Sequence, residues 1–373
     1  MPIPPTSLKA CFINLRAYHI FEESSQIATG GAEIALHELA PLLGKHVNTT
    51  IITGDFGQGH QIKTQHITLL SSLKLRRQNP FTQLWKFWNA LKEARSDVYI
   101  ESVFGKTVFF TWLFCRLYRK KFIYITASDS ECDGSAIKRY PITGNLFKIA
   151  LEHADVIDVS VAHHEDQLRT HHPNITCPIA YIPLGMHAYT PSATAKRTTI
   201  LWVARCEPWK NPFLFLELAK RFPKEQFIMI AAPLENQLRL FKEVKQQAKH
   251  IKNMRFIEGL PHRKLDEYFL HAKITVNTSD FEGYSMAFMQ SGLAGTPIAT
   301  LNLNPDSVIT THDLGTCAHG DFELLVQQVR TLLEHPEELR KKSNNIASYM
   351  RAHYDVERVA EQWLRLFAEM FAS

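Results

Sequence analysis

The stretch SDFEGYSMAFMQSGLAGTPIA, residues 279–299, decides how the second half of the chain folds. It follows KITVNTS (273–279), a run rich in β-branched residues that predicts a strand. The residues from Tyr284 to Ala294 predict a helix, because they are mostly apolar and contain no proline. Gly295-Thr-Pro297 ends that helix and leads into a second strand, PIATLNL. The order strand, glycine turn, helix, strand is typical of a parallel α/β sheet.

A helix that begins in a turn after a strand presents unpaired backbone N–H groups and the positive end of its dipole. Such an end can bind an anion or an oxygen-rich ligand. Glu282 precedes this helix, and its carboxylate could accept hydrogen bonds from hydroxyl groups. The plainer interpretation is a βαβ unit whose acid caps the helix, and the stretch alone leaves both interpretations open.

The chain as a whole has the size and composition of a two-domain globular protein. It has 373 residues, 45% of them hydrophobic and 21% charged. Its six cysteines show neither metal-ligand nor disulfide-framework spacing, which favours a reducing compartment. The N-terminus has no apolar core of signal-peptide length, and no apolar run reaches 18 residues. We therefore expect a cytoplasmic protein, either free or peripheral on the inner face of the membrane.

The first half also alternates strands and helices. LKACFIN (8–14) predicts a strand, Gly30-Gly31 opens a helix, and VNTTIIT (47–53) predicts the next strand. A Gly-Gly pair allows close backbone approach to a ligand, although it occurs more often in a simple turn. Further strands are expected in DVYIES (97–102), KFIYITAS (121–128), ADVIDVSV (154–161) and IAYIPLG (179–185).

The pattern divides the chain into two doubly wound Rossmann-like domains. We expect an N-terminal domain over residues 1–185 and a linker over 186–199, where the residues become polar and small. A C-terminal domain should span 200–350. The amphipathic tail over 351–373 should pack back on the first domain, because its apolar face needs a partner.

Two cations follow the first strand of the second half, ILWVAR. Arg205 ends that strand, and Lys210 stands in the next loop between Pro208 and Pro212. Two cations at the carboxyl end of a strand suit a doubly charged group such as a diphosphate. Two solvated surface cations would give the same pattern, so these two residues alone do not show whether a diphosphate binds here.

Acids and histidines cluster at the ends of two other strands. Asp129, Glu131 and Asp133 follow KFIYITAS, where they could bind a metal, meet hydroxyl groups or be solvated. The segment HHEDQLRTHH, with histidine pairs at 163–164 and 171–172, follows ADVIDVSV. No third ligand stands at zinc-site spacing, so we expect surface histidines and no metal site.

Residues 63–148 are strongly basic, with 15 Lys and Arg against 6 Asp and Glu, while the whole chain carries only +5. Aromatic residues accompany this charge in FTQLWKFWNALK (81–92) and TVFFTWLFCRLYRKK (107–121). The second segment is apolar nearly all round, which favours burial inside a domain. The alternative is contact with an anionic membrane surface. Nucleic acid is not expected, because no recognition motif accompanies the charge.

Together these features resemble the family 4 glycosyltransferases, whose GT-B fold has two Rossmann-like domains facing across a cleft. GGAE (30–33) is similar to the glycine loop of the family's first domain, and VARCEPWKNP (203–212) to its motif of Arg, four residues, Lys. SDFEGYSMAFMQSGLAGTPI is similar to its signature of Glu, seven residues, Glu. The motifs occur in the family's order, and the resemblance covers nearly the whole chain.

The resemblance implies transfer of a sugar from a nucleotide-diphosphate donor, with retention and without a metal or other cofactor. Arg205, Lys210 and Glu282 would be the catalytic residues: the cations would hold the diphosphate, and Glu282 would meet the sugar hydroxyls. Six residues would bind the donor: Gly30, Gly31, Gly283, Tyr284, Ser285 and Gln290.

Three positions depart from the family pattern. Gln290 replaces the second Glu of the signature; its amide can still bond to ribose but cannot act as a base. Many family members have a histidine at the end of the strand that is KFIYITAS here, and another at the position of Glu101; this chain has neither. We therefore place acceptor contacts at Glu101, Ser128, Asp129 and Asp133.

The expected function is a retaining glycosyltransferase of cell-surface polysaccharide synthesis, with a UDP- or GDP-linked donor and a saccharide or lipid-linked acceptor. The departures leave one alternative from another class, a catalytically silent GT-B subunit that binds a nucleotide sugar or a partner protein. A nicotinamide-dependent oxidoreductase would need the G-x-G-x-x-G fingerprint, which the chain lacks.

Overall fold

The computed structural model describes residues 7–22, 30–64, 66–75, 79–189, 196–282 and 285–372. These residues divide into two compact units. Unit 1 holds the described residues up to 186 together with 356–372, and unit 2 holds those from 187 to 355. The expected linker over 186–199 falls in part on residues 190–195, which lie outside the described part of the chain.

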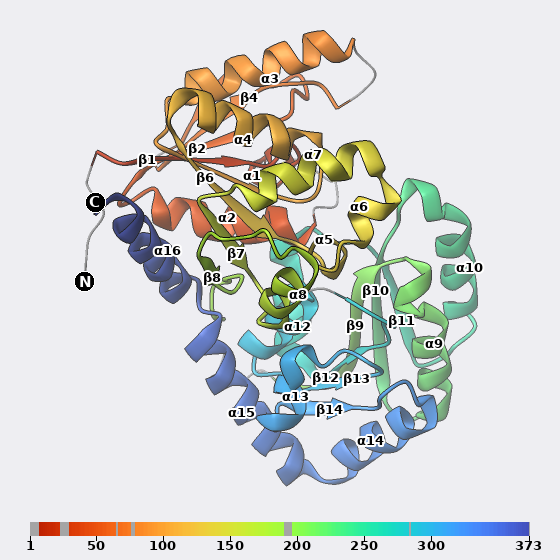
Figure 1. The fold of residues 1–373 in the computed structure, drawn as a ribbon. Coiled ribbons are helices and arrows are strands. Elements are labelled where there is room, and N and C mark those ends of the chain that lie inside the picture. Colours follow the sequence, from red (N-terminus) through yellow and green to blue (C-terminus); the bar gives the residue numbers. More distant parts are fainter. Residues whose placement is uncertain are drawn as a thin grey trace. The chain divides into compact units, whose positions relative to one another are not determined.

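Unit 1 is built on a sheet with the strand order β3-β4-β2-β1-β5-β6-β7-β8 (Figure 1). All neighbouring strands are parallel except β3 and β4. The strands are β1 (Lys9–Ile13), β2 (Asn48–Thr53), β3 (Gln61–Lys63), β4 (Ile67–Ser71), β5 (Val98–Ser102), β6 (Lys121–Thr126), β7 (Val156–Val159) and β8 (Ile179–Tyr181). The helices are α1 (Tyr18–Phe21), α2 (Gly31–Leu43), α3 (Pro80–Ala94), α4 (Lys106–Tyr118), α5 (Asp129–Cys132), α6 (Ser135–Arg139), α7 (Pro141–Glu152), α8 (His163–His171) and α16 (Val356–Phe371).

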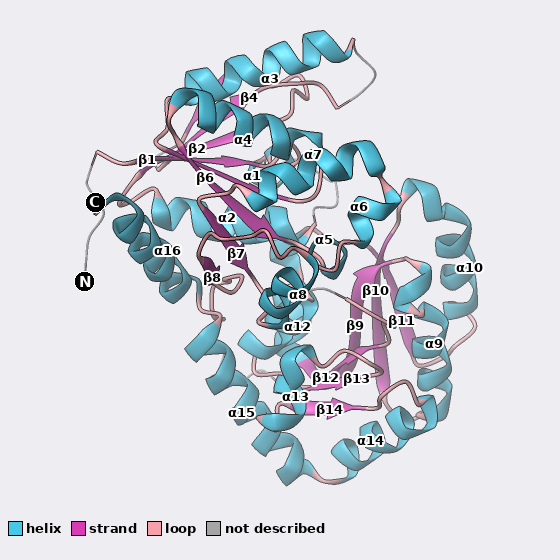
Figure 2. Ribbon diagram, in the orientation of Figure 1, coloured by secondary structure: helices cyan, strands magenta, loops and turns pink. Residues whose placement is uncertain are grey.

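Helices cover both faces of this sheet (Figure 2). Because side chains alternate along a strand, Cys11 and Ile13 of β1 join the core under α3, α4 and α7. Phe12 of β1 points the other way and packs against α2 and α16, where its ring lies 6.1 Å from that of Trp363 in an edge-to-face contact. Strands buried on both faces explain why the sequence shows continuous apolar runs here.

The amphipathic helix α16 belongs to unit 1, although 169 residues of unit 2 precede it in the chain. Its apolar side chains Val359, Trp363 and Phe367 are buried against α2 and the sheet. Burying each of these large side chains contributes roughly 1.5–3 kcal/mol. We expected the tail helix to start at residue 351. Residues 351–353 instead belong to the end of α15 (Pro336–His353), and α16 begins at Val356.

Unit 2 is built on a parallel sheet with the order β11-β10-β9-β12-β13-β14. Its strands are β9 (Thr199–Arg205), β10 (Gln226–Ala232), β11 (Met254–Glu258), β12 (Ala272–Asn277), β13 (Ile298–Thr300) and β14 (Gly315–Cys317). Its α-helices are α9 (Pro212–Arg221), α10 (Leu238–Ala248), α11 (Asp266–His271), α12 (Met286–Leu293), α13 (Val308–Thr311), α14 (Phe322–Glu334) and α15. Short 3₁₀ helices are η1 (Pro208–Lys210), η2 (Glu235–Gln237), η3 (His262–Lys264) and η4 (Pro305–Ser307).

In the described part of the stretch over 279–299, the helix α12 (Met286–Leu293) and the strand β13 follow each other in the predicted order, while Gly283 and Tyr284 lie outside the described residues. Gly292 faces α15, and a Cβ atom there would lie only 2.4 Å from Cγ of Met350. Gly295 has φ of +67°, a conformation that side chains other than glycine rarely adopt. The glycines of this stretch therefore let α12 lie close to α15 and end sharply before β13.

No helix among the described residues is long and apolar enough to cross a membrane.

Candidate functional site

The centre of the candidate site in unit 2 is an ion pair between Lys210 and Glu282. Nζ of Lys210 lies 2.8 Å from Oε2 of Glu282, and the two side chains are only 12% and 11% exposed. Lys210 ends η1, which follows β9, and Glu282 lies five residues beyond the end of β12. Because β9 and β12 are neighbours in the sheet, their carboxyl ends bring the two loops together.

Hydrogen bonds connect the loop after β9 to the loop after β12. Asn211, in the left-handed conformation, donates to Oδ1 of Asp280 at 2.6 Å and to the carbonyl of Thr278 at 3.1 Å. The Thr278 hydroxyl donates to the carbonyl of Lys210 at 2.6 Å and accepts from the Trp202 indole at 3.0 Å. These hydrogen bonds hold the backbone in place on both sides of the ion pair.

The second oxygen of Glu282 is also bound. Oε1 accepts hydrogen bonds from the Ser279 hydroxyl at 2.6 Å and from the Asn277 amide at 2.7 Å. Burial opposes ionisation of this carboxyl, but the charge of Lys210 and the hydrogen bonds outweigh it and lower the pKa of Glu282. Glu282 is therefore a preformed carboxylate beside a fixed cation.

Arg205 ends β9 on the surface, with its side chain 48% exposed. Its Nη2 lies 3.4 Å from Oε2 of Glu207, which is itself nearly buried. A small hollow beside this strand end is lined by residues that include Ala204, Asn277, Ser279 and Ala287. The strand end therefore offers an exposed guanidinium close to a recess in the same unit.

Ser285 and Gln290 belong to the start and middle of α12. Ser285 is the residue before the first helical turn and is 4% exposed. Gln290 is 2% exposed, and its Nε2 has no hydrogen-bond partner among the described residues. Gly283 and Tyr284, which we expected to bind the donor, lie outside the described residues.

In unit 1, Gly30 and Gly31 open α2 as expected from the sequence. The Gly30 N–H donates to Oε2 of Glu33 at 2.7 Å, and a Cβ atom on Gly30 would lie 2.6 Å from that oxygen. Glycine at position 30 thus allows the helix's own acid to fold back over its N-terminus.

The predicted acceptor-side residues lie at the carboxyl ends of β5 and β6. Glu101 is 3% exposed, its Oε2 has no hydrogen-bond partner among the described residues, and burial raises its pKa to about 7. Such burial does not favour direct contact with an acceptor. Ser128 bonds to the Ser130 hydroxyl at 3.0 Å, and Asp133 accepts from the Ser135 N–H at 2.8 Å in a local turn.

The acids that follow β6 do not converge on one point. Glu131 points inward and accepts from the Ala127 N–H at 2.8 Å, from the Tyr124 hydroxyl at 3.0 Å and from the Phe104 N–H at 3.3 Å. Asp133 is bound in its own turn, and Asp129 faces histidine side chains. A metal site made of the three acids, which the sequence left open, is not formed.

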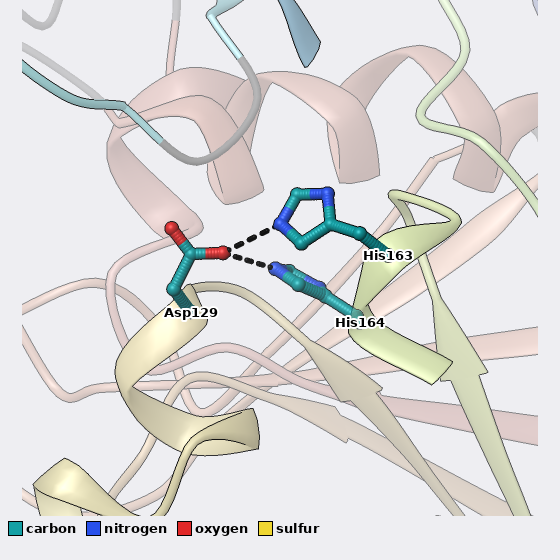
Figure 3. Close-up of side chains that lie close together, drawn as sticks. All are labelled: Asp129, His163 and His164. Atoms are coloured by element: carbon teal, nitrogen blue, oxygen red, sulfur yellow. Dashed lines mark hydrogen bonds and ion pairs between the residues drawn. The ribbon is translucent and has the colours of Figure 1, made fainter. Parts of the chain in front are cut away.

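Asp129 instead meets two histidines from the start of α8 (Figure 3). Its Oδ1 lies 2.8 Å from Nε2 of His163 and 3.0 Å from Nε2 of His164. Contact with His164 lowers the pKa of Asp129, against the effect of partial burial, and His163 adds to the shift.

The expectation of surface histidines is wrong for the second member of each pair, because His164 and His172 are both 1% exposed. The contact of His163 and His164 with Asp129 was not predicted from the sequence. The signal was present, since acids follow one strand and histidines follow the next strand of the sheet.

Comparison with solved structures shows the fold of the whole chain. Sucrose-phosphate synthase from Thermosynechococcus elongatus superposes with a TM-score of 0.81 at 17% identity and covers 98% of this chain and 99% of its own. The Anabaena protein HepE, in complex with UDP and glucose, gives a TM-score of 0.75 at 14% identity over 97% and 99%. The chain therefore has the GT-B fold, with two parallel α/β sheet units.

Sequence comparison adds a match to a family model within unit 2. Residues 191–351 match the model of the family "Glycosyl transferases group 1". Over 356 residues, covering 92% of this chain and 96% of the relative, the chain is 23% identical to an enzyme of Campylobacter jejuni. That enzyme is a GalNAc-alpha-(1->4)-GalNAc-alpha-(1->3)-diNAcBac-PP-undecaprenol alpha-1,4-N-acetyl-D-galactosaminyltransferase. These matches support a glycosyltransferase, and the family segment contains Arg205, Lys210 and Glu282.

Proposed function

We propose that the protein is a retaining, metal-independent family 4 glycosyltransferase that uses a nucleotide-diphosphate sugar. The observation that carries this proposal is the buried Lys210–Glu282 pair at adjacent strand ends, inside the segment that matches the glycosyltransferase model. A silent subunit that binds a nucleotide sugar would use the same pair, so donor turnover is what separates the two hypotheses. The alternative of a silent subunit rests on Gln290, whose amide can still hydrogen-bond to ribose, and on the missing histidines at Glu101 and at the end of KFIYITAS.

The cations of unit 2 would act on the leaving group. Cleavage of the sugar–phosphate C–O bond sends its electron pair to the phosphate oxygen, and the acceptor oxygen bonds to the same face of the sugar. The acceptor's proton then passes to a phosphate oxygen. Lys210 and Arg205 would stabilise the charge that develops on the diphosphate, as preorganised positive groups do in a water-poor site. Because side chains supply this charge, donor activation would need no metal.

Glu282 would orient the sugar. Its carboxylate accepts hydrogen bonds from Ser279 and Asn277 now, and sugar hydroxyls would donate to it in the donor complex. Its lowered pKa keeps it an acceptor at neutral pH. Ser285 and the first turn of α12 would add backbone N–H groups to the same ligand, and Gln290 would meet the ribose. In unit 1, Gly30 and Gly31 remain proposed donor contacts, and Ser128, Asp129 and Asp133 proposed acceptor contacts.

A UDP-linked sugar and a lipid-linked saccharide are the substrates we propose to test first. The Anabaena neighbour was solved with UDP and glucose, and the Campylobacter relative acts on an undecaprenol-diphosphate-linked glycan. Both likenesses extend over nearly the whole chain. The role would then be the extension of a cell-surface glycan at the inner face of the membrane, with GDP-linked sugars as the second donor class.

Unit 1 carries side chains suited to that membrane surface. Phe81 and Trp85 on α3 are 83% and 65% exposed, and Ile142 on α7 is 81% exposed. Arg116 and Arg119 stand at the end of α4, whose middle is buried as the apolar pattern predicted. We propose that these apolar side chains enter an anionic membrane while the cations contact its headgroups.

The proposal is tested by nucleotide release from a panel of UDP- and GDP-sugars with a lipid extract as acceptor. Lys210→Ala should lower turnover by about 100- to 1000-fold, as loss of one transition-state charge contact does. Lys220→Ala is the matched control, because Lys220 is a 55% exposed lysine of the same unit, paired with Glu217. Full turnover by Lys210→Ala would refute the diphosphate assignment. Donor binding without turnover of any sugar would favour the silent subunit.

A further inference from the structure

Three potential metal ligands converge at the carboxyl ends of β6 and β7 in unit 1. Asp129 opens α5 after β6, and His163 and His164 open α8 after β7. One ligand atom from each side chain lies within 4.8 Å of the other two. Figure 3 shows both imidazole rings presenting a nitrogen to the same carboxylate oxygen. Because β6 and β7 are paired in the sheet, the backbone itself holds the two helix starts side by side.

The buried member of the group has its second nitrogen fixed. Nδ1 of His164 lies 3.0 Å from the hydroxyl of Thr126, which is 1% exposed. When this hydroxyl accepts a hydrogen bond from Nδ1–H, Nε2 of His164 carries a lone pair. A partner of this kind behind the ring is the usual support of a metal-binding histidine.

In that tautomer, two hydrogen-bond acceptors face each other with no proton between them. The Nε2 lone pair of His164 and Oδ1 of Asp129 would face one another at 3.0 Å, which is repulsive unless a cation lies between them. A proton on Nε2 is one solution, and a metal ion shared with His163 is the other. Ligand atoms of a tetrahedral zinc ion stand about 3.3 Å apart. The present separations of 2.8 and 3.0 Å would need to widen by only a few tenths of an ångström.

We propose that Asp129, His163 and His164 form a Zn²⁺ site. Two imidazoles and one carboxylate are the ligand set of zinc sites that keep an open position, whereas Ca²⁺ and Mg²⁺ prefer oxygen ligands throughout. Asp129 and His163 are 43% and 42% exposed, so the remaining position faces solvent and can take water or an oxygen of another ligand. The proposed site differs from our expectation of no metal, and it does not depend on the proposed donor chemistry of unit 2.

The site is tested by metal binding to the full-length protein. The chain is stripped with a chelator, dialysed against zinc, and its bound metal is counted by mass spectrometry. The wild-type chain should bind one equivalent, and Co²⁺ in its place should give the visible absorption bands of a four-coordinate site. Asp129→Asn and His163→Ala should each remove this equivalent, while their circular dichroism stays that of the wild type. Thr126→Val, which removes only the support behind His164, should weaken binding roughly 10- to 100-fold.

The matched control is His171→Ala, which removes an exposed histidine of the same helix that is not among these ligands. It should bind zinc as the wild type does. The proposal is overturned if the wild-type chain binds no zinc, or if His171→Ala loses as much as His163→Ala. It is also overturned if ¹⁵N spectra of the zinc-treated protein show a proton on Nε2 of His164, because the proton would then be the bridging cation.

Discussion

Both units place an acid just beyond the end of a central strand, but they neutralise it differently. In unit 2, Glu282 has a lysine 2.8 Å away and two neutral hydrogen-bond donors. In unit 1, Asp129 has two histidine nitrogens at 2.8 and 3.0 Å, and Glu101, on the strand next to β6, is buried with no cation beside it among the described residues. The strand ends therefore hold an ion pair in unit 2 and, at Glu101, a buried carboxyl with a pKa of about 7 in unit 1.

The largest effect is expected from breaking the ion pair of unit 2. Glu282→Gln should lower the free energy of unfolding by about 3–5 kcal/mol, because Lys210 would stay nearly buried without its counter-charge. Urea denaturation followed by tryptophan fluorescence measures this. In the double variant with Lys210→Met, much of the loss should be recovered, since no charge is then left unpaired. Equal stability of Glu282→Gln and the wild type would show that the pair is solvated and would remove the contrast with unit 1.

The next effect concerns Glu101, the buried acid without a cation. Burial raises its pKa from the ordinary 4.5 to about 7 in the folded chain. Between these pH values the folded state holds the proton and the unfolded state does not, so stability falls as pH rises from 4.5 through 7. The loss from this group should be on the order of 3 kcal/mol. Glu101→Gln should therefore flatten the pH dependence of the unfolding free energy and stabilise the protein at pH 8.

The control for that experiment is Glu93→Gln, an acid whose side chain is 44% exposed and which pairs with His60. It should leave the slope between pH 5 and pH 8 nearly unchanged, since exposed pairs contribute about 0–1 kcal/mol. A slope that Glu101→Gln does not alter would mean that the carboxyl reaches water in solution. Unit 1 would then contain no uncompensated buried acid at this strand end.

The smallest effect compares exposed aromatic side chains of the two units. Trp85 in unit 1 and Phe281 in unit 2 are both 65% exposed. Trp85→Ala should weaken binding to anionic liposomes roughly tenfold, because about 1.4 kcal/mol of apolar transfer is lost. Phe281→Ala should leave liposome binding unchanged. Equal losses in the two variants, measured by co-sedimentation, would contradict membrane docking through unit 1.

The sequence was sufficient for the fold class and for the position of single residues at strand ends. The apolar runs and glycine turns predicted both sheets, and the strand-end positions of Arg205, Lys210 and Glu282 followed from them. The pairing of Lys210 with Glu282 was not predictable in the same way, because it depends on β9 lying beside β12 and on Asn211 linking the loops. Those contacts join residues about seventy positions apart.

The histidines show why spacing along the chain is a poor guide to a site. No third ligand stands at zinc-site spacing around HHEDQLRTHH, yet Asp129 lies beside this segment in space because β6 is paired with β7. Glu101 shows a related limit. Its strand is buried on both faces, so a polar residue there is enclosed whichever way it points, and local sequence does not reveal how many faces are covered.

The return of the chain from unit 2 to supply α16 has a consequence for biosynthesis. The face of the first sheet that holds Phe12 receives Trp363 and Phe367 only after residues 187–355 have been made. At ordinary translation rates that interval is roughly 10–30 s. During this time the nascent first unit presents an incomplete apolar face. Unit 2, whose segments are nearly continuous, can therefore finish folding before the unit that begins the chain.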